Sequence, residues 1–151
     1  MTMQSAQTNA YYVNIFISHS WSYSEHYEKL SEWIFDGNWR SNNRPIKFND
    51  LSIPQDDPIH DAANQDELQA AIFNEIAKCH VVVIPTGMYT THSKWIQKEI
   101  EGSNEYGKPI LGVNPWGQER ASSVVRKNAR QTVGWTGDSV INGIWSLYSG
   151  S

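Results

Sequence analysis

An unbroken run of apolar residues, Val81–Pro85, is the feature that most constrains the fold. A strand with one solvated face alternates apolar and polar residues, whereas a strand buried on both faces is apolar throughout. Strands of the second kind belong to parallel sheets that carry helices on both sides. The run therefore predicts a central strand of a parallel α/β sheet.

The rest of the chain repeats a strand followed by a helix five times. Crossovers of this length, all right-handed, build a doubly wound sheet. The sequence thus predicts an α/β, flavodoxin-like three-layer sandwich with a five-stranded parallel sheet of order 2-1-3-4-5. The strand led by Pro45 is expected at an edge, because proline cannot donate to a ladder. Predicted strands cover residues 11–18, 46–51, 81–85, 108–113 and 132–135, and predicted helices begin near residues 24, 64, 93, 121 and 138.

The composition suits one ordinary domain of 151 residues. Residues 1–10 are polar and unpatterned and are expected to form a mobile tail, with residues 11–151 as the single domain. A net charge of −4 without a Lys/Arg run argues against a nucleic-acid partner. No apolar run reaches the length of a membrane span and no signal peptide is visible, so the expected location is cytoplasmic. The lone Cys79 is expected to be a buried thiol rather than a nucleophile.

The segment at residues 93–102 holds the main candidate for chemistry. Ser93 is the predicted N-cap of a helix in which Trp95 and Glu99, four residues apart, share a face. Ile96 and Ile100 form the neighbouring buried stripe. Glu99 is thereby expected at the margin of the buried face, where partial desolvation favours chemistry. The alternative is that Trp95 packs and Glu99 caps a turn or pairs with a lysine.

Other candidates follow the ends of the predicted strands. Doubly wound sheets bind ligands beyond the carboxyl ends of their strands, where the strand order reverses. Ser18 and Asp50 are placed there as candidate substrate-binding residues, although each fits a turn cap equally well. His19 is a candidate substrate-binding residue or a plain packed histidine. Trp116 is a candidate stacking partner for a ring of the substrate, or a hydrophobic plug over a strand end.

No metal site is predicted. His60 and His92 have no Asp or Cys at ligand spacing. A Gly-rich phosphate loop is also lacking, which argues against a kinase, an NTPase or a Rossmann dehydrogenase.

Taken in order, these motifs resemble a TIR domain. The resemblance rests on Ile15-Phe-Ile-Ser-His-Ser20, the long loop after Asp50, the strand at 81–85, Trp95-x-x-x-Glu99 and Lys108-Pro-Ile-Leu-Gly-Val113. The subtype is similar to the TIR-like proteins of bacterial Thoeris antiphage systems. One departure is His19-Ser-Trp21 after the first strand, where many members carry Tyr or Arg-rich residues. The residues that hold adenine and phosphates are therefore not assigned.

The resemblance implies an enzyme that cleaves NAD between nicotinamide and ribose, with Glu99 as the catalytic residue and Trp95 beside the substrate. NAD is then the substrate and no cofactor is required. The implied product is a cyclic or conjugated ADP-ribose nucleotide that activates a partner effector protein in antiviral defence. Self-association through TIR surfaces is a further implied partnership.

Two other functions fit the same residues. One is a non-catalytic TIR-like adaptor that assembles through its loops, with the acidic loop at 52–65 and the excess of aromatic residues as contact surface. The other is an enzyme similar to nucleoside deoxyribosyltransferases, in which a glutamate also attacks a sugar carbon.

Overall fold

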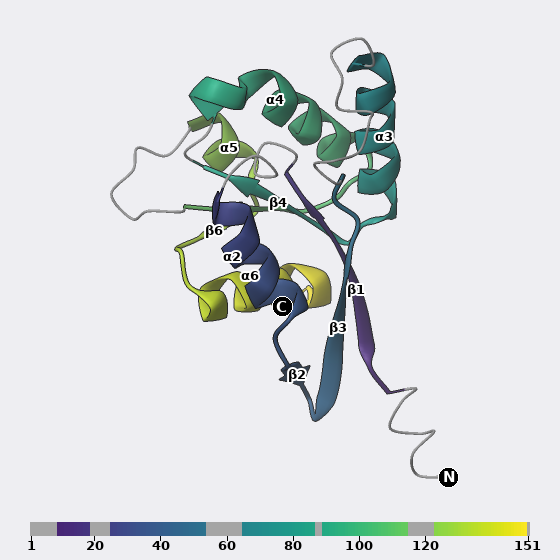
Figure 1. Ribbon diagram of the computed structural model, residues 1–151, viewed down its shortest axis with the longest axis vertical. Helices are drawn as coiled ribbons and strands as arrows, with labels where there is room; N and C mark the ends of the chain where they lie inside the picture. Colours follow the sequence, from purple (N-terminus) through teal and green to yellow (C-terminus); the bar gives the residue numbers. More distant parts are fainter. Residues whose placement is uncertain (1–8, 19–24, 54–64, 87–88, 115–122, 151) are drawn as a thin grey trace.

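The computed structural model describes residues 9–18, 25–53, 65–86, 89–114 and 123–150 (Figure 1). Strands and helices alternate along most of the chain, as the sequence predicts. The elements in order are β1 (Tyr11–Ile17), α2 (Glu25–Phe35), β2 (Trp39–Ser41), β3 (Arg44–Asp50), α3 (Gln65–Lys78), β4 (Val81–Pro85), α4 (Tyr89–Glu105), β5 (Ile110–Val113), α5 (Ser123–Asn128), β6 (Gln131–Val133) and α6 (Gly137–Ser149).

The strands form one sheet of six in the order β2-β3-β1-β4-β5-β6. The neighbours from β3 to β6 pair in parallel, and β4 lies inside the sheet as its apolar run predicts. These five strands have the predicted 2-1-3-4-5 order. The prediction of a five-stranded, wholly parallel sheet is wrong by one strand, because β2 adds to β3 in the antiparallel sense and makes the sheet mixed.

A tight hairpin explains the additional strand. Asn42 and Asn43 join β2 to β3 and have φ angles of 53° and 62°. A two-residue hairpin turn whose twist matches that of the strands requires positive φ at both central residues. Asparagine tolerates positive φ well. β2 has three residues, and a strand this short cannot be recognised from an alternating apolar and polar pattern. The expectation that the proline-led strand lies at the edge is therefore wrong: β2 covers β3, and Pro45 pairs with Arg40.

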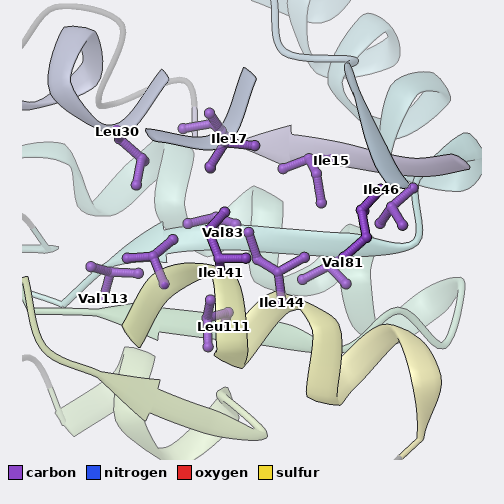
Figure 2. Packing of buried hydrophobic residues seen from close by; sticks show 13 residues of the cluster. Ile15, Ile17, Leu30, Ile46, Val81, Val83, Leu111, Val113, Ile141 and Ile144 are labelled. Carbon is purple, nitrogen blue, oxygen red and sulfur yellow. The ribbon is translucent and has the colours of Figure 1, made fainter. Parts of the chain in front are cut away.

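Helices cover both faces of the sheet, giving the predicted three layers (Figure 1). One face packs against α2 and α6, and Figure 2 shows Leu30, Ile141 and Ile144 over the side chains of β1, β4 and β5. The opposite face packs against α3, α4 and α5. Residues alternate between the two cores along β1: Ile15 and Ile17 belong to the first and Phe16 to the second. This alternation follows from the two-residue period of a strand.

Two helix starts differ from the prediction. α4 begins at Tyr89, so Ser93 lies inside the helix and is not its cap. The β-branched Thr90 and Thr91 have low helix propensity, which favoured a later start. α6 is capped by Thr136, whose side chain accepts from the Ser139 N–H, rather than by Asp138 or Ser139.

The prediction for Cys79 is confirmed, because its thiol is fully buried. Burial raises the thiol pKa to about 12, against a smaller opposing effect of Lys108. A thiol in this state is a poor nucleophile. The predicted tail at 1–10 lies largely outside the described residues, which begin at Asn9.

Candidate functional site

A buried hydrogen bond joins the end of β1 to the middle of α4. The Ser18 hydroxyl donates to Glu99 Oε1 over 2.6 Å, and both residues have zero exposure. The length is typical of a hydroxyl bound to a carboxylate. Ser18 is fixed in turn by its backbone N–H, which donates to Val83 O over 2.8 Å. Two residues predicted from separate motifs, 81 positions apart, therefore meet at the carboxyl edge of the sheet.

The surroundings of Glu99 on α4 follow the helical period. Ile96 and Ile100 are buried in the core below, as predicted. Trp95, one turn earlier, is half-buried at the border of that core and has the Lys94 ammonium 5.5 Å from its ring. Glu99 itself is fully buried, deeper than the predicted margin.

Two further contacts fix α4 around Glu99. The Ser103 hydroxyl, one turn later, donates to the Glu99 carbonyl over 2.7 Å. The Lys98 ammonium donates to Gln69 on α3 over 2.6 Å, so the neighbouring lysine is directed to another helix.

Asp50 lies on the opposite face of the sheet from Glu99. It pairs in register with Ile15, whose side chain belongs to the core under α2 and α6. Asp50 Oδ1 accepts from the Ser52 N–H over 2.9 Å, and Oδ2 accepts from the Tyr27 hydroxyl over 3.2 Å. Burial and, to a lesser degree, Asp50 raise the pKa of Tyr27 to about 12. The turn-capping alternative for Asp50 is therefore what the structure displays, and its role toward a substrate stays a prediction.

The structure thus joins Ser18 to Glu99, places Trp95 one turn before Glu99 on α4, and leaves Asp50 on the other face. His19 and Trp116 lie outside the described residues, as do the loop histidine His60 and the side chain of His92. The predicted roles of His19 and Trp116 stay predictions.

Sequence reasoning missed three hydroxyl and amide side chains on the Glu99 side of the sheet. Ser103 and Thr86 are fully buried, and Asn114 has a buried side-chain oxygen. A sequence signal existed for each. Ser103 follows Glu99 by four residues on a face that is otherwise apolar, and Thr86 and Asn114 immediately follow the apolar strands β4 and β5.

Neither a metal site nor a membrane span is found in the described part of the chain. No group of three His, Cys, Asp or Glu side chains there is arranged to hold an ion. Within the same residues, no helix has the length and apolarity needed to cross a bilayer.

A hollow of about 790 Å³ lies beside the β2–β3 hairpin and the end of α2. Its lining includes Trp39, Arg40, Lys47 and Phe48. Ser18 and Glu99 do not line it. The hollow is therefore a separate feature from the buried carboxylate.

Fold and site together define a doubly wound α/β domain with a buried carboxylate at the carboxyl edge of its sheet. The sequence profile of a family described as "Thoeris protein ThsB, TIR-like domain" matches residues 16–120. The chain therefore belongs to the ThsB TIR-like family, and the resemblance deduced from its motifs is confirmed. Membership suggests a part in Thoeris-type defence signalling.

The other comparisons add the fold alone. The chain is similar to a crystal structure of a mutation variant of SsGBP, with a TM-score of 0.55 and 13% sequence identity. The match covers 95% of this chain and 58% of the other, so this chain spans somewhat more than half of that protein. A search of curated proteins gave no match.

Proposed function

We propose that this protein is a NAD-cleaving TIR enzyme in which Glu99 is the catalytic residue. The observation that carries the proposal is the Ser18–Glu99 hydrogen bond, which fixes a fully buried carboxyl group at the carboxyl edge of the sheet. Ligands of doubly wound sheets bind at that edge. A carboxylate buried in an ordinary core is costly, and such groups concentrate where they serve a function.

The proposed chemistry is cleavage of the bond between the ribose C1′ and the nicotinamide nitrogen. The bonding electron pair leaves with nicotinamide, whose positively charged ring nitrogen becomes neutral. The ribose carbon then carries oxocarbenium character, as in glycoside hydrolysis. The carboxylate of Glu99 stabilises this developing positive charge, and the Ser18 hydroxyl holds the carboxylate in one orientation.

The fate of the ribose carbon decides the product. Attack by water gives ADP-ribose, whereas attack by a nucleophile within the substrate or on an acceptor gives a cyclic or conjugated nucleotide. Membership in the ThsB family favours the second outcome, with a nucleotide signal that activates a partner effector. In that scheme NAD is the substrate, and no separate cofactor takes part.

The test is chromatography with mass spectrometry of NAD incubated with purified protein. Wild type is compared with Glu99→Gln, which removes the charge and almost no volume, and with Glu101→Gln, a control on the exposed side of the same helix. We expect NAD loss and a new ADP-ribose-derived species with wild type and Glu101→Gln, and no turnover with folded Glu99→Gln.

The same comparison is repeated on lysates of phage-infected cells that express each protein, in case turnover depends on infection. Turnover by folded Glu99→Gln would remove Glu99 from the catalytic role. Absence of turnover by wild type in both settings would favour the adaptor function.

A further inference from the structure

Two buried polar atoms near the carboxyl edge of the sheet have no hydrogen-bond partner. They are Thr86 Oγ1 and Asn114 Oδ1, and no other buried side-chain nitrogen or oxygen within the described residues is in this state. Thr86 has zero exposure. Most buried polar atoms are paired, so an unpaired one calls for an explanation such as a bound ligand.

The two atoms belong to neighbouring residues across the sheet. Pro85 pairs with Val113 in the parallel ladder between β4 and β5, and the Thr86 N–H donates to Val113 O over 2.9 Å. Thr86 and Asn114 are therefore the next two residues of adjacent strands. Ile84 and Ile110 face the core under α3, α4 and α5, so the two-residue period directs Thr86 and Asn114 to that same side.

The absence of a side chain at Gly112 leaves room for the Thr86 methyl group. A Cβ atom at Gly112 would lie 3.2 Å from Thr86 Cγ2 and 3.4 Å from Ala129 Cβ. The methyl group thus occupies the space toward β5 and the end of α5. The hydroxyl, at a tetrahedral angle from the methyl, is directed elsewhere.

Ser18 and Glu99 lie on the same side of the sheet as Thr86 and Asn114. Ile17 pairs with Val83, so Ser18 is level with Ile84 and two residues behind Thr86. A strand spacing of about 4.8 Å and two rises of about 3.3 Å place the Cα atoms of Ser18 and Thr86 about 8 Å apart. Because Ser18 is bonded to Glu99, a ligand at Glu99 lies close to Thr86, and Asn114 is the next residue across the sheet.

We propose that Thr86 and Asn114 form a subsite for the carboxamide of the nicotinamide ring, a proposal that rests on NAD being the substrate. A primary amide has a carbonyl acceptor and N–H donors. The Thr86 hydroxyl donates to the carbonyl, and Asn114 Oδ1 accepts from the amide nitrogen. The carboxamide is separated from the ribose carbon by part of a pyridine ring, so Glu99 engages the ribose while this pair engages the amide.

The subsite makes the protein selective for an amide over an acid. Nicotinic acid adenine dinucleotide replaces the amide with a carboxylate, which has no proton for Asn114 Oδ1. The buried oxygen then faces a negative charge without a donor between them. Sites built to hydrogen-bond a substrate group discriminate strongly against analogues that lack it.

The experiment measures binding of NAD and of nicotinic acid adenine dinucleotide by calorimetry, with turnover assayed separately. The variants are Thr86→Val, which removes the hydroxyl at nearly constant volume, and Thr86→Ser, which keeps it. We expect wild type to bind NAD at least tenfold more tightly than the acid. Thr86→Val is expected to weaken NAD binding about tenfold, the loss of one hydrogen bond, and to reduce the discrimination. Thr86→Ser is expected to retain both.

Thermal melting separates a ligand contact from a structural one. Because the hydroxyl has no partner within the protein, Thr86→Val is expected to melt at the same temperature as wild type or higher. A lower melting temperature with unchanged NAD binding would overturn the subsite, as would equal binding of amide and acid by wild type. Selective binding without turnover would leave the subsite standing and remove the proposed enzymatic function. Absence of NAD binding would remove both.

Discussion

The two faces of the sheet differ in the polarity of their buried side chains. Within the described residues, the buried side chains that pack under α2 and α6 are all apolar. The face under α3, α4 and α5 is also mainly apolar, but the four buried polar residues of the described chain lie on that side: Ser18, Thr86, Glu99 and Ser103. Asp50, the carboxylate on the first face, is exposed and bonded within the protein.

This difference sets a purely stabilising face against the face that carries the proposed site. An all-apolar face contributes burial free energy with no polar group to satisfy. A face with buried hydroxyl and carboxyl groups gives up part of that energy and gains groups suited to bind a polar ligand. The two faces should therefore respond in opposite ways to substitution, which the following predictions test.

The largest effect on stability is expected from Ile144→Ala on the apolar face. Ile144 on α6 has zero exposure and packs against β4 and β5 (Figure 2). Truncation leaves a cavity and should lower the free energy of unfolding by about 3 kcal/mol. Urea denaturation measures the loss, and the turnover per folded molecule should stay at the wild-type value. A fall in turnover per folded molecule would show that the two faces are not separable.

Ser18→Ala is expected to change activity more than stability. The substitution removes the hydroxyl that orients Glu99 and should cost about 1–3 kcal/mol, because a buried acceptor loses its donor. Turnover should fall by at least tenfold. The matched control is Ser52→Ala: the Ser52 hydroxyl accepts from the Ile17 N–H over 2.9 Å, so this variant loses one hydrogen bond near the same strand end without touching Glu99.

Comparable stability losses with a fall in turnover for Ser18→Ala alone would assign the buried hydroxyl to function. Equal turnover in both variants would reduce the Ser18–Glu99 contact to a structural one.

The smallest expected effect is a pH dependence at the opposite edge of the sheet. His80 Nδ1 accepts from the Asn14 N–H over 2.8 Å, and the ring packs edge-on against Tyr148 of α6 at 5.0 Å. Burial, and secondarily the charge of Lys108, lower the His80 pKa below its usual 6.5. The folded protein therefore binds fewer protons at this site than the unfolded chain. The stabilising contribution is complete above pH 6.5 and declines as the pH falls toward the folded pKa.

His80→Asn tests this sign, because its side-chain oxygen can replace Nδ1 as an acceptor that does not titrate. We expect the melting temperatures of variant and wild type to converge or cross as the pH is lowered from 8 to 5. A parallel shift of both proteins over that range would contradict the assignment to His80.

Much of the fold could be predicted because its signals are local. Strands alternate with helices along the sequence, and the run of β4 is apolar throughout; together these signals identify the α/β class and the parallel order. The spacing of Trp95 and Glu99 likewise identifies a helix. β2 was not predicted because three residues are too few to show the two-residue period of a strand. The sequence signal for β2 was the Asn42-Asn43 pair, which is suited to a hairpin turn. The face of Asp50 was readable, since Ile46, Phe48 and Asp50 alternate along one strand and the first two are apolar.

The sequence alone determined which residues repeat with the period of a strand or a helix, because that period is a property of the local backbone. Tertiary structure decided which of those residues meet. Ser18 reaches Glu99 across 81 positions, and Thr86 lies beside Asn114 across 28, through strand register and helix packing. Register depends on the free energy of the whole core, so no local pattern specifies that a hydroxyl on one strand end will orient a carboxylate on a distant helix.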